Sequence, residues 1–219
     1  MNIGTVILIF SGTIAAAYLI GAIPFGFLIG KLNGVDIRKE GSCNIGATNV
    51  TRVVGKGWGK LCFLCDFLKG FLPVLLAAYL DRTFLPEQAG WLTASTALAA
   101  MLGHIFPVYL GFRGGKGVST AAGAALALNP LAVVIAGAVW AAVFFIFRYV
   151  SLASLAAALA LPLSAWLLKY TAGIAMAPPV GILLILFAAL TFWRHRTNIT
   201  RLINGTENRF ERKNEKRNE

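Results

Sequence analysis

Hydrophobic residues run along this chain in long blocks that are separated by short polar segments. A helix that crosses a membrane needs about 20 mostly apolar residues. Six blocks meet this requirement and are predicted to be spanning helices: Ile3–Gly30, Trp58–Leu80, Ala89–Leu110, Leu131–Phe147, Ser151–Leu168 and Ala175–Trp193. A further stretch, Val118–Asn129, is apolar but short, and Asn129-Pro130 ends it.

Composition strengthens this interpretation. Hydrophobic residues make up 58% of the 219 residues and the mean hydropathy is +0.73, which is more than a soluble interior can bury. Charged residues are only 13%, against about a quarter in soluble chains. The first block is too long for the apolar core of a signal peptide, and no basic segment precedes it. The fold class expected is an all-α, polytopic membrane helix bundle.

The distribution of basic residues predicts the orientation, because Lys and Arg collect on the cytoplasmic side. Loop 31–57 holds five of them, whereas loop 81–88 holds Arg82 beside two acidic residues. The segment after Trp193 is again rich in Arg and Lys. An outside N-terminus and a cytoplasmic C-terminus require an odd number of crossings. Counting Val118–Asn129 as a short span gives seven, and five crossings with one late segment in the interface is the alternative.

The chain shows no internal repeat and no separate soluble domain. Residues 1–207 are expected to form one membrane domain, and residues 208–219 a charged, disordered cytoplasmic tail. The net charge of +11 fits the cytoplasmic loops of a membrane protein better than nucleic-acid binding. The three cysteines make no disulfide framework, and Cys62 and Cys65 lack the further ligands that a zinc site needs.

Three polar clusters lie at the inner ends of apolar blocks, so the topology places them on one face of the membrane. They are rich in glycine, hydroxyl, amide and arginine side chains, which favours a site over simple packing. Their sequences are "GSCNIGATNVTR" (Gly41–Arg52), "GFRGGKGVST" (Gly111–Thr120) and "RHRTNITRLINGTE" (Arg194–Glu207).

The second cluster has the features of an anion site. Glycines let backbone N–H groups approach an oxyanion, and Gly114–Gly117 leads into a helix that begins near Val118, whose N-terminus favours negative charge. Lys116 adds a positive charge and Ser119 a hydroxyl. The spacing is not that of a Walker A loop. A flexible loop with an exposed lysine is the structural alternative.

The first and third clusters supply complementary groups. Ser42 offers a hydroxyl, and Arg52 a planar guanidinium that suits phosphate. His195 and Asn198 are three residues apart and would share one face of a helix that extends the last span. A capped connecting loop and a basic helix at the membrane surface are the alternatives. The residues alone predict a membrane protein with a cytoplasmic-side phosphate site, and they show no H-x-x-x-x-D pair and no G-x-S-x-G elbow.

The three clusters, with "GHIFPVYLGFRGGKGVST" and "DFLKG" at Asp66–Gly70, resemble the bacterial membrane acyl-phosphate:glycerol-3-phosphate acyltransferases, the PlsY family. The resemblance runs from the first span to Glu207. One departure is Ser42-Cys43-Asn44-Ile45, where the family often has glycine and proline at positions 43 and 45.

The resemblance implies transfer of an acyl group from acyl phosphate to sn-glycerol 3-phosphate, giving lysophosphatidic acid and phosphate, without cofactor or metal. It implies a catalytic set of Ser42, Lys116, His195 and Asn198. Glycerol 3-phosphate would be held by Ser42, Arg52, Lys116, His195 and Asn198. Acyl phosphate would be held by Asn44, Thr48, Gly114, Gly115, Gly117 and Ser119. The base is either a phosphate oxygen of a substrate or His195.

The resemblance also implies a bacterial inner-membrane enzyme with a cytoplasmic active site. Its expected partners are the two substrates, membrane lipid and a soluble enzyme that produces acyl phosphate, with no nucleic acid. A transporter of organophosphates or other anions is the alternative function, but transporters commonly show internal repeats and sites near the midplane. A lipid-binding scaffold subunit would not need three anion-suited clusters.

Overall fold

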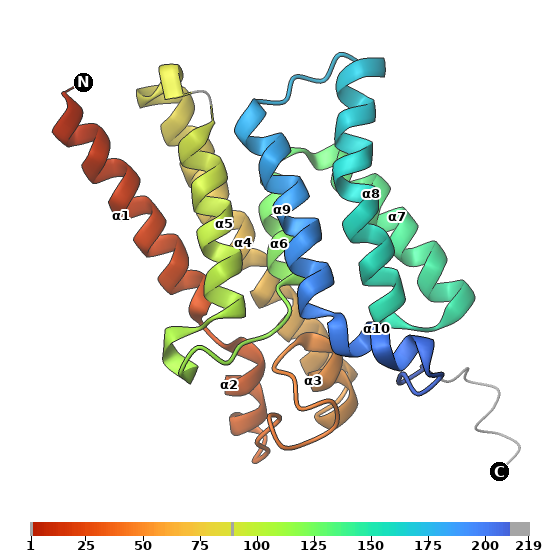
Figure 1. Cartoon of the computed structure of the whole chain (residues 1–219). Helices are drawn as coiled ribbons and strands as arrows, with labels where there is room; N and C mark the ends of the chain where they lie inside the picture. The colour runs from red at the N-terminus through yellow and green to blue at the C-terminus, as the bar shows by residue number, and fades with distance from the viewer. Residues whose placement is uncertain (1, 89, 211–219) are drawn as a thin grey trace, which may run out of the picture.

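The computed structural model describes residues 2–88 and 90–210, and within these ranges the chain forms helices and no strands (Figure 1). The α-helices are α1 (Ile3–Ala22), α2 (Phe25–Leu32), α3 (Ala47–Val53), α4 (Lys56–Phe84), α5 (Trp91–Ile105), α6 (Val118–Leu128), α7 (Pro130–Phe147), α8 (Val150–Thr171), α9 (Pro178–Arg194) and α10 (Arg196–Ile203). Two 3₁₀ turns, η1 (Pro86–Gln88) and η2 (Val108–Leu110), lie in connections.

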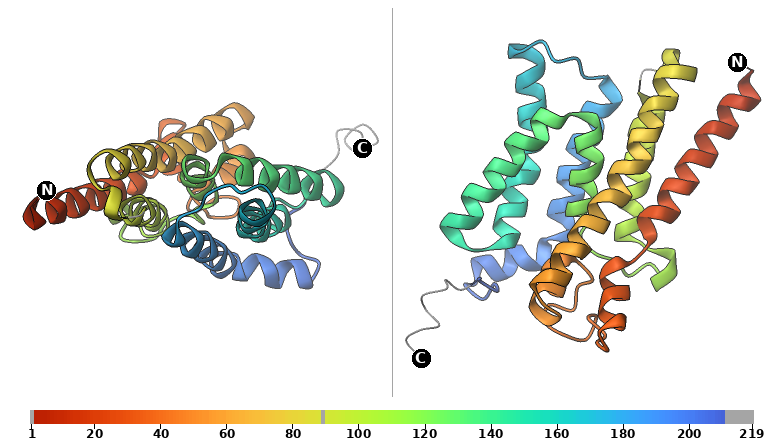
Figure 2. Two further views of the ribbon diagram at one scale, coloured as in Figure 1. Left: turned by 90° about the horizontal axis from the view of Figure 1, so that it is seen from above. Right: turned by 180° about the vertical axis from the view of Figure 1, so that it is seen from behind.

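The helices form one elongated bundle with a distinct end. The longer helices α1, α4, α5, α7, α8 and α9 and the shorter α6 run along the bundle, whereas α2, α3 and α10 gather at its lower end (Figures 1 and 2). We call this lower end the site end. The N-terminus of α1 lies at the opposite end (Figure 1). All three polar clusters of the sequence therefore come together at one end of the molecule.

The apolar blocks predicted from the sequence are confirmed as apolar helices. Five stretches are long and apolar enough to cross a membrane: Ile3–Leu32, Lys56–Phe84, Trp91–Leu110, Pro130–Phe147 and Val150–Thr171. Helices α9 and α10, bent by 58° at their junction, add a sixth if they are counted together. Helix α6 is a shorter apolar helix. The number of crossings stays a prediction.

The first apolar block is not one continuous helix. It breaks at Ile23-Pro24, because proline has no N–H and disfavours helical backbone in the residue before it. The carbonyl of Ile23 accepts a hydrogen bond of 2.7 Å from Nζ of Lys69 on α4. Lys69 also lies 2.8 Å from Oδ1 of Asp66, the pairing that their spacing predicts. A buried ion pair thus holds the break between α1 and α2.

Close packing between α4 and α6 depends on two glycines. A Cβ at Gly70 would overlap the carbonyl of Thr120, and a Cβ at Gly123 would overlap the carbonyl of Phe67. Small residues at such crossings let helix backbones approach closely, which is how membrane helices gain packing energy without a hydrophobic driving force between them. The contact fixes the start of α6, and therefore the polar loop before it, against α4.

The turn between α6 and α7 is also fixed. Asn129 is buried, and its side chain accepts a hydrogen bond of 3.1 Å from the amide of Ala132 in the first turn of α7. Pro130 occupies the first helical position, where its missing N–H costs nothing. This capped turn makes α6 and α7 a hairpin whose open end faces the site end.

Candidate active site

A polar pocket of about 170 Å³ lies at the site end, where the three clusters converge. Nine of the eleven residues predicted for the site line it: Ser42, Asn44, Thr48, Arg52, Lys116, Gly117, Ser119, His195 and Asn198. They come from the loop before α3, from α3, from the loop before α6, from α6 and from the junction of α9 and α10. Segments more than 100 residues apart in sequence therefore share one pocket.

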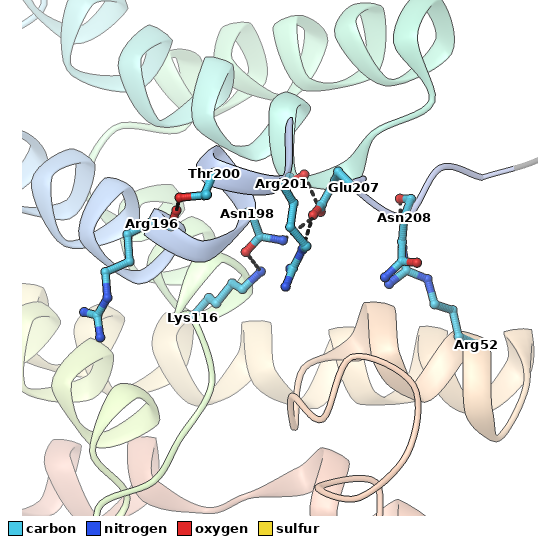
Figure 3. Close-up of polar contacts among 9 residues, drawn as sticks. Arg52, Lys116, Arg196, Asn198, Thr200, Arg201, Glu207 and Asn208 are labelled. Atoms are coloured by element: carbon cyan, nitrogen blue, oxygen red, sulfur yellow. Dashed lines mark hydrogen bonds and ion pairs between the residues drawn. The ribbon is translucent and has the colours of Figure 1, made fainter. Parts of the chain in front are cut away.

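A chain of hydrogen bonds organises the charges in this pocket (Figure 3). Nζ of Lys116 donates to Oδ1 of Asn198 at 2.6 Å, and Nδ2 of Asn198 donates to Glu207 at 2.7 Å. Glu207 also accepts from Nε of Arg201 at 2.7 Å and from the hydroxyl of Ser151 at 2.8 Å. Because Glu207 takes the amide nitrogen of Asn198, the amide oxygen faces the lysine.

The surroundings shift the ionisation of two of these groups. Burial, with the nearby arginines, lowers the pKa of Lys116 to about 8, although Glu207 opposes the shift. Burial alone would raise the pKa of Glu207, but hydrogen bonds from Arg201, Asn198 and Ser151 outweigh it and hold that pKa below its ordinary value. Glu207 is therefore a carboxylate at neutral pH, and Lys116 is close to its titration point.

His195 lies at the break between α9 and α10 and is buried. Its Nδ1 lies 2.8 Å from the carbonyl oxygen of Thr191, which can only accept, so Nδ1 carries a proton. The other ring nitrogen, Nε2, is left for the pocket. The sequence predicted that His195 and Asn198 share the face of one continuous helix. The helix instead bends by 58° at His195, and both side chains still line the pocket.

Gly114 and Gly115 do not line the polar pocket. Their N–H groups donate to the carbonyls of Ile105 and His104 at 3.2 and 3.1 Å, and their own carbonyls accept from Arg194 at 3.1 Å each. Their N–H groups are therefore already hydrogen-bonded within the protein and do not face an oxyanion. A Cβ at Gly115 would overlap the His104 ring, so glycine is needed there for close approach. The part of the glycine loop that reaches the pocket is Lys116 and Gly117.

The loop before α3 is held in shape by Asn49. Oδ1 of this buried side chain accepts from the amide of Ser42 at 2.8 Å, and Nδ2 donates to the carbonyls of Ile37 and Glu40 at 3.0 and 3.1 Å. The clamp positions Ser42 at the pocket. Cys43 beside it has a φ of 56°, a left-handed backbone that favours glycine.

A second, larger pocket of about 610 Å³ adjoins the polar one. Its walls are mostly apolar and aromatic side chains of α4, α6, α7, α8 and α9. The residues that line both pockets are Ala47, Thr48, Phe63, Val118, Trp140, Val150 and Ser154. A molecule with a phosphate headgroup and a long apolar chain could therefore occupy the two together.

Comparison with known proteins decides the family. Residues 11–205 match the family model described as glycerol-3-phosphate acyltransferase. The chain belongs to this family. The glycerol-3-phosphate acyltransferases of Aquifex aeolicus and Desulfotalea psychrophila are 47% and 50% identical to it. These alignments cover 89% and 90% of this chain and 95% and 96% of the relatives.

Solved structures of the family have the same fold. The crystal structure of PlsY, an integral membrane glycerol 3-phosphate acyltransferase, in its glycerol 3-phosphate form has a TM-score of 0.83 and 44% identity. It covers 92% of this chain and 96% of that one. The lysophosphatidic acid form has a TM-score of 0.80, with 44% identity, and covers 92% and 95%. This acyltransferase is accordingly an integral membrane protein.

Sequence reasoning missed several residues that shape the acyltransferase pocket. Glu207 ends the third cluster and is its lone acidic residue, which was the available signal. Ser151 lies among apolar residues at the start of α8, and no sequence pattern distinguishes it. His104 is also among the lining residues, and a single histidine inside an apolar block is as consistent with a structural role as with a functional one. Across residues 2–88 and 90–210, no three His, Cys, Asp or Glu side chains are grouped to hold a metal ion.

Proposed function

We propose that this acyltransferase transfers an acyl group from acyl phosphate to the 1-hydroxyl of sn-glycerol 3-phosphate, at the cytoplasmic side of a bacterial inner membrane. The products are 1-acyl-sn-glycerol 3-phosphate, which is lysophosphatidic acid, and inorganic phosphate. The family, and the glycerol 3-phosphate and lysophosphatidic acid forms of the PlsY structures, support the acceptor and the product.

The continuity of the two pockets is the observation that carries the proposal. An acyl phosphate has one apolar and one dianionic end, which match the pocket of about 610 Å³ and the cationic pocket beside it. Its carbonyl carbon would lie at the junction, near Thr48 and Ser154. Glycerol 3-phosphate would occupy the polar pocket with Arg52, Lys116 and their neighbours Ser42, His195 and Asn198.

The chemistry requires one bond exchange and one proton transfer. The glycerol hydroxyl oxygen attacks the acyl carbon, the bond from that carbon to the phosphate oxygen breaks, and phosphate leaves with the electron pair. Glu207 is the one carboxylate among the described residues that line the polar pocket, and its bound donors make it a poor base. We assign the hydroxyl proton to a phosphate oxygen of a substrate, with Nε2 of His195 as the alternative acceptor.

Rate enhancement would then come mainly from positioning and from charge stabilisation. Lys116 offers an ammonium held by Asn198, with further N–H bonds left for substrate oxygens. It would stabilise the charge that develops on the carbonyl oxygen and on the leaving phosphate.

The topology is part of the proposal. Seven crossings, counting the short α6, with the N-terminus outside and the C-terminus inside, put the site end in the cytoplasm. Two observations support that arrangement. Basic residues gather at the site end, and the N-terminus of α1 lies at the end of the bundle opposite α10 (Figure 1). Residues 1–207 would act as one domain, and a soluble enzyme that makes acyl phosphate would be its supplier. Residues 211–219 of the expected tail lie outside the described residues, whereas Asn208 and Phe210 contact the bundle.

The test uses purified full-length protein in lipid nanodiscs with palmitoyl phosphate and radiolabelled glycerol 3-phosphate. The expected result is labelled lysophosphatidic acid and one inorganic phosphate per product, without added nucleotide or metal. A preference for acyl-CoA, or product formation abolished by a chelator, would contradict the proposal. Retention of half the turnover or more in His195→Gln would favour substrate phosphate as the base.

A further inference from the structure

The chain after α10 adds two residues, Glu207 and Asn208, to the lining of the polar pocket. Residues Glu207–Phe210, which we call the C-terminal clasp, are fixed at both ends. Glu207 is bound by Asn198, Arg201 and Ser151. At the other end the amide of Phe210 donates to the carbonyl of Arg148 at 3.0 Å. The clasp lies beyond residue 205, where the match to the family model ends.

The clasp contacts Arg52 in two ways. Nη2 of Arg52 donates to the backbone carbonyl of Asn208 at 3.3 Å (Figure 3). Its guanidinium carbon also lies 5.0 Å from the ring centre of Phe210, within the range of a cation–π interaction. Arg52 is exposed on the short helix α3, so these contacts restrict a long side chain that would otherwise sample many rotamers.

Phe210 belongs to the apolar pocket as well. It packs edge-on against Phe144 of α7, with ring centres 5.8 Å apart, and both line the apolar pocket. One aromatic ring therefore contacts a cation of the polar pocket and walls the apolar pocket. The clasp therefore contacts both α3, through Arg52, and the turn between α7 and α8, through Arg148.

We propose that Phe210 is a positioning residue for both substrates. Its ring holds Arg52 toward the phosphate of glycerol 3-phosphate and forms part of the apolar wall that shields the acyl chain from water. The proposal rests on the proposed function for the identity of the two substrates.

Two substitutions separate the two tasks of the ring. Phe210→Ala removes both, and the KM values for glycerol 3-phosphate and for acyl phosphate should each rise about two- to fivefold, the size of an exposed cation–π or aromatic contact. Phe210→Leu keeps an apolar wall but has no π face. It should restore the KM for acyl phosphate while the KM for glycerol 3-phosphate stays raised. Restoration of both values, or wild-type values in Phe210→Ala, would overturn the proposal.

The control is Phe147→Ala, an exposed phenylalanine at the end of α7 that lines neither pocket. Both KM values should be unchanged. A double-mutant cycle tests whether Phe210 acts through Arg52. In an Arg52→Ala background, Phe210→Leu should cause no further rise in the KM for glycerol 3-phosphate. An additive rise would contradict the assignment.

Equilibrium binding separates this proposal from the identity of the acyl donor. Calorimetric titration of the full-length protein with glycerol 3-phosphate alone needs no donor, and Phe210→Leu should weaken binding about two- to fivefold. If the wild type fails to use acyl phosphate but Phe210→Leu still weakens binding of glycerol 3-phosphate, the proposed donor is wrong and the role of the clasp stands. Equal binding by wild type and Phe210→Leu refutes the role of the clasp.

Discussion

Asn198 connects the two charged groups Lys116 and Glu207 in the polar pocket. An amide has a donor end and an acceptor end, and here the donor end binds Glu207 and the acceptor end binds Lys116. The carboxylate thus reaches the lysine through an amide instead of pairing with it directly. The positive charge of Lys116 is held in place without being neutralised by a direct ion pair.

Loss of that charge should slow catalysis strongly. Lys116→Ala is expected to lower kcat by about 10²–10³-fold, the typical effect of removing one preorganised donor. Lys116→Arg should recover little, because a planar guanidinium does not replace a compact ammonium. Steady-state kinetics in nanodiscs would measure both. Near wild-type turnover in folded Lys116→Ala at saturating substrates would show that the loop only connects helices.

The pH dependence should report the same residue. The pKa of Lys116 is lowered to about 8, so its charge is present below that pH and is lost as the pH rises through it. The ratio kcat/KM for glycerol 3-phosphate, which reports the free enzyme, should fall above about pH 8. In the pH profile of kcat, this fall should occur at a higher pH, because bound phosphate favours the charged lysine. If kcat/KM of Lys116→Arg falls at the same pH as that of the wild type, the titrating group is another residue.

At the scale of the elements, the sequence predicted what depends on local pattern. Hydropathy and block length predicted the apolar helices, and Asn129-Pro130 predicted the turn after α6. The break before α2 could have been predicted from Pro24, which the prediction of one continuous first span did not take into account. The hydrogen bonds of the Gly114 and Gly115 amides could not have been predicted from any sequence pattern. They depend on how the loop packs against the end of α5, which is a tertiary contact.

The crossing of α4 and α6 offers a test of packing. Gly123→Ala places a methyl group against the carbonyl of Phe67 and should lower the stability of the folded protein by about 1–3 kcal/mol, as overpacking does. Gly137→Ala on α7 is the matched control, since its Cβ would meet nothing within 4 Å. Thermal unfolding in detergent would compare them. Equal melting temperatures for the two variants would mean that the crossing can relax.

At the scale of the whole molecule, the charge asymmetry predicted that the polar clusters share one face, and the structure brings them to one end (Figure 1). Which residues touch inside the site was harder to predict. Lys116 and Asn198 are 82 residues apart, and their hydrogen bond depends on the bend at His195. The larger apolar pocket also had no sequence signal, because its lining residues are indistinguishable from those that face lipid.

Membrane orientation can be measured by cysteine labelling in intact cells. Arg82→Cys and Lys169→Cys should react with an impermeant maleimide from outside, and Arg196→Cys only after permeabilisation, because the proposed topology puts the site end in the cytoplasm. Cys43 is exposed and needs removal first. Cys43→Gly suits its left-handed backbone. Protection of both outer positions together with external labelling of Arg196→Cys would reverse the proposed topology.

The continuity of the polar and apolar pockets has a consequence for how the enzyme encounters its substrates. One substrate would arrive by diffusion in the plane of the bilayer and the other from a volume of water. The apparent affinity for the acyl donor should then follow its mole fraction among lipids rather than its amount per litre. Adding inert phospholipid at a fixed total of donor should slow the reaction by surface dilution. The same addition should leave the dependence on glycerol 3-phosphate unchanged.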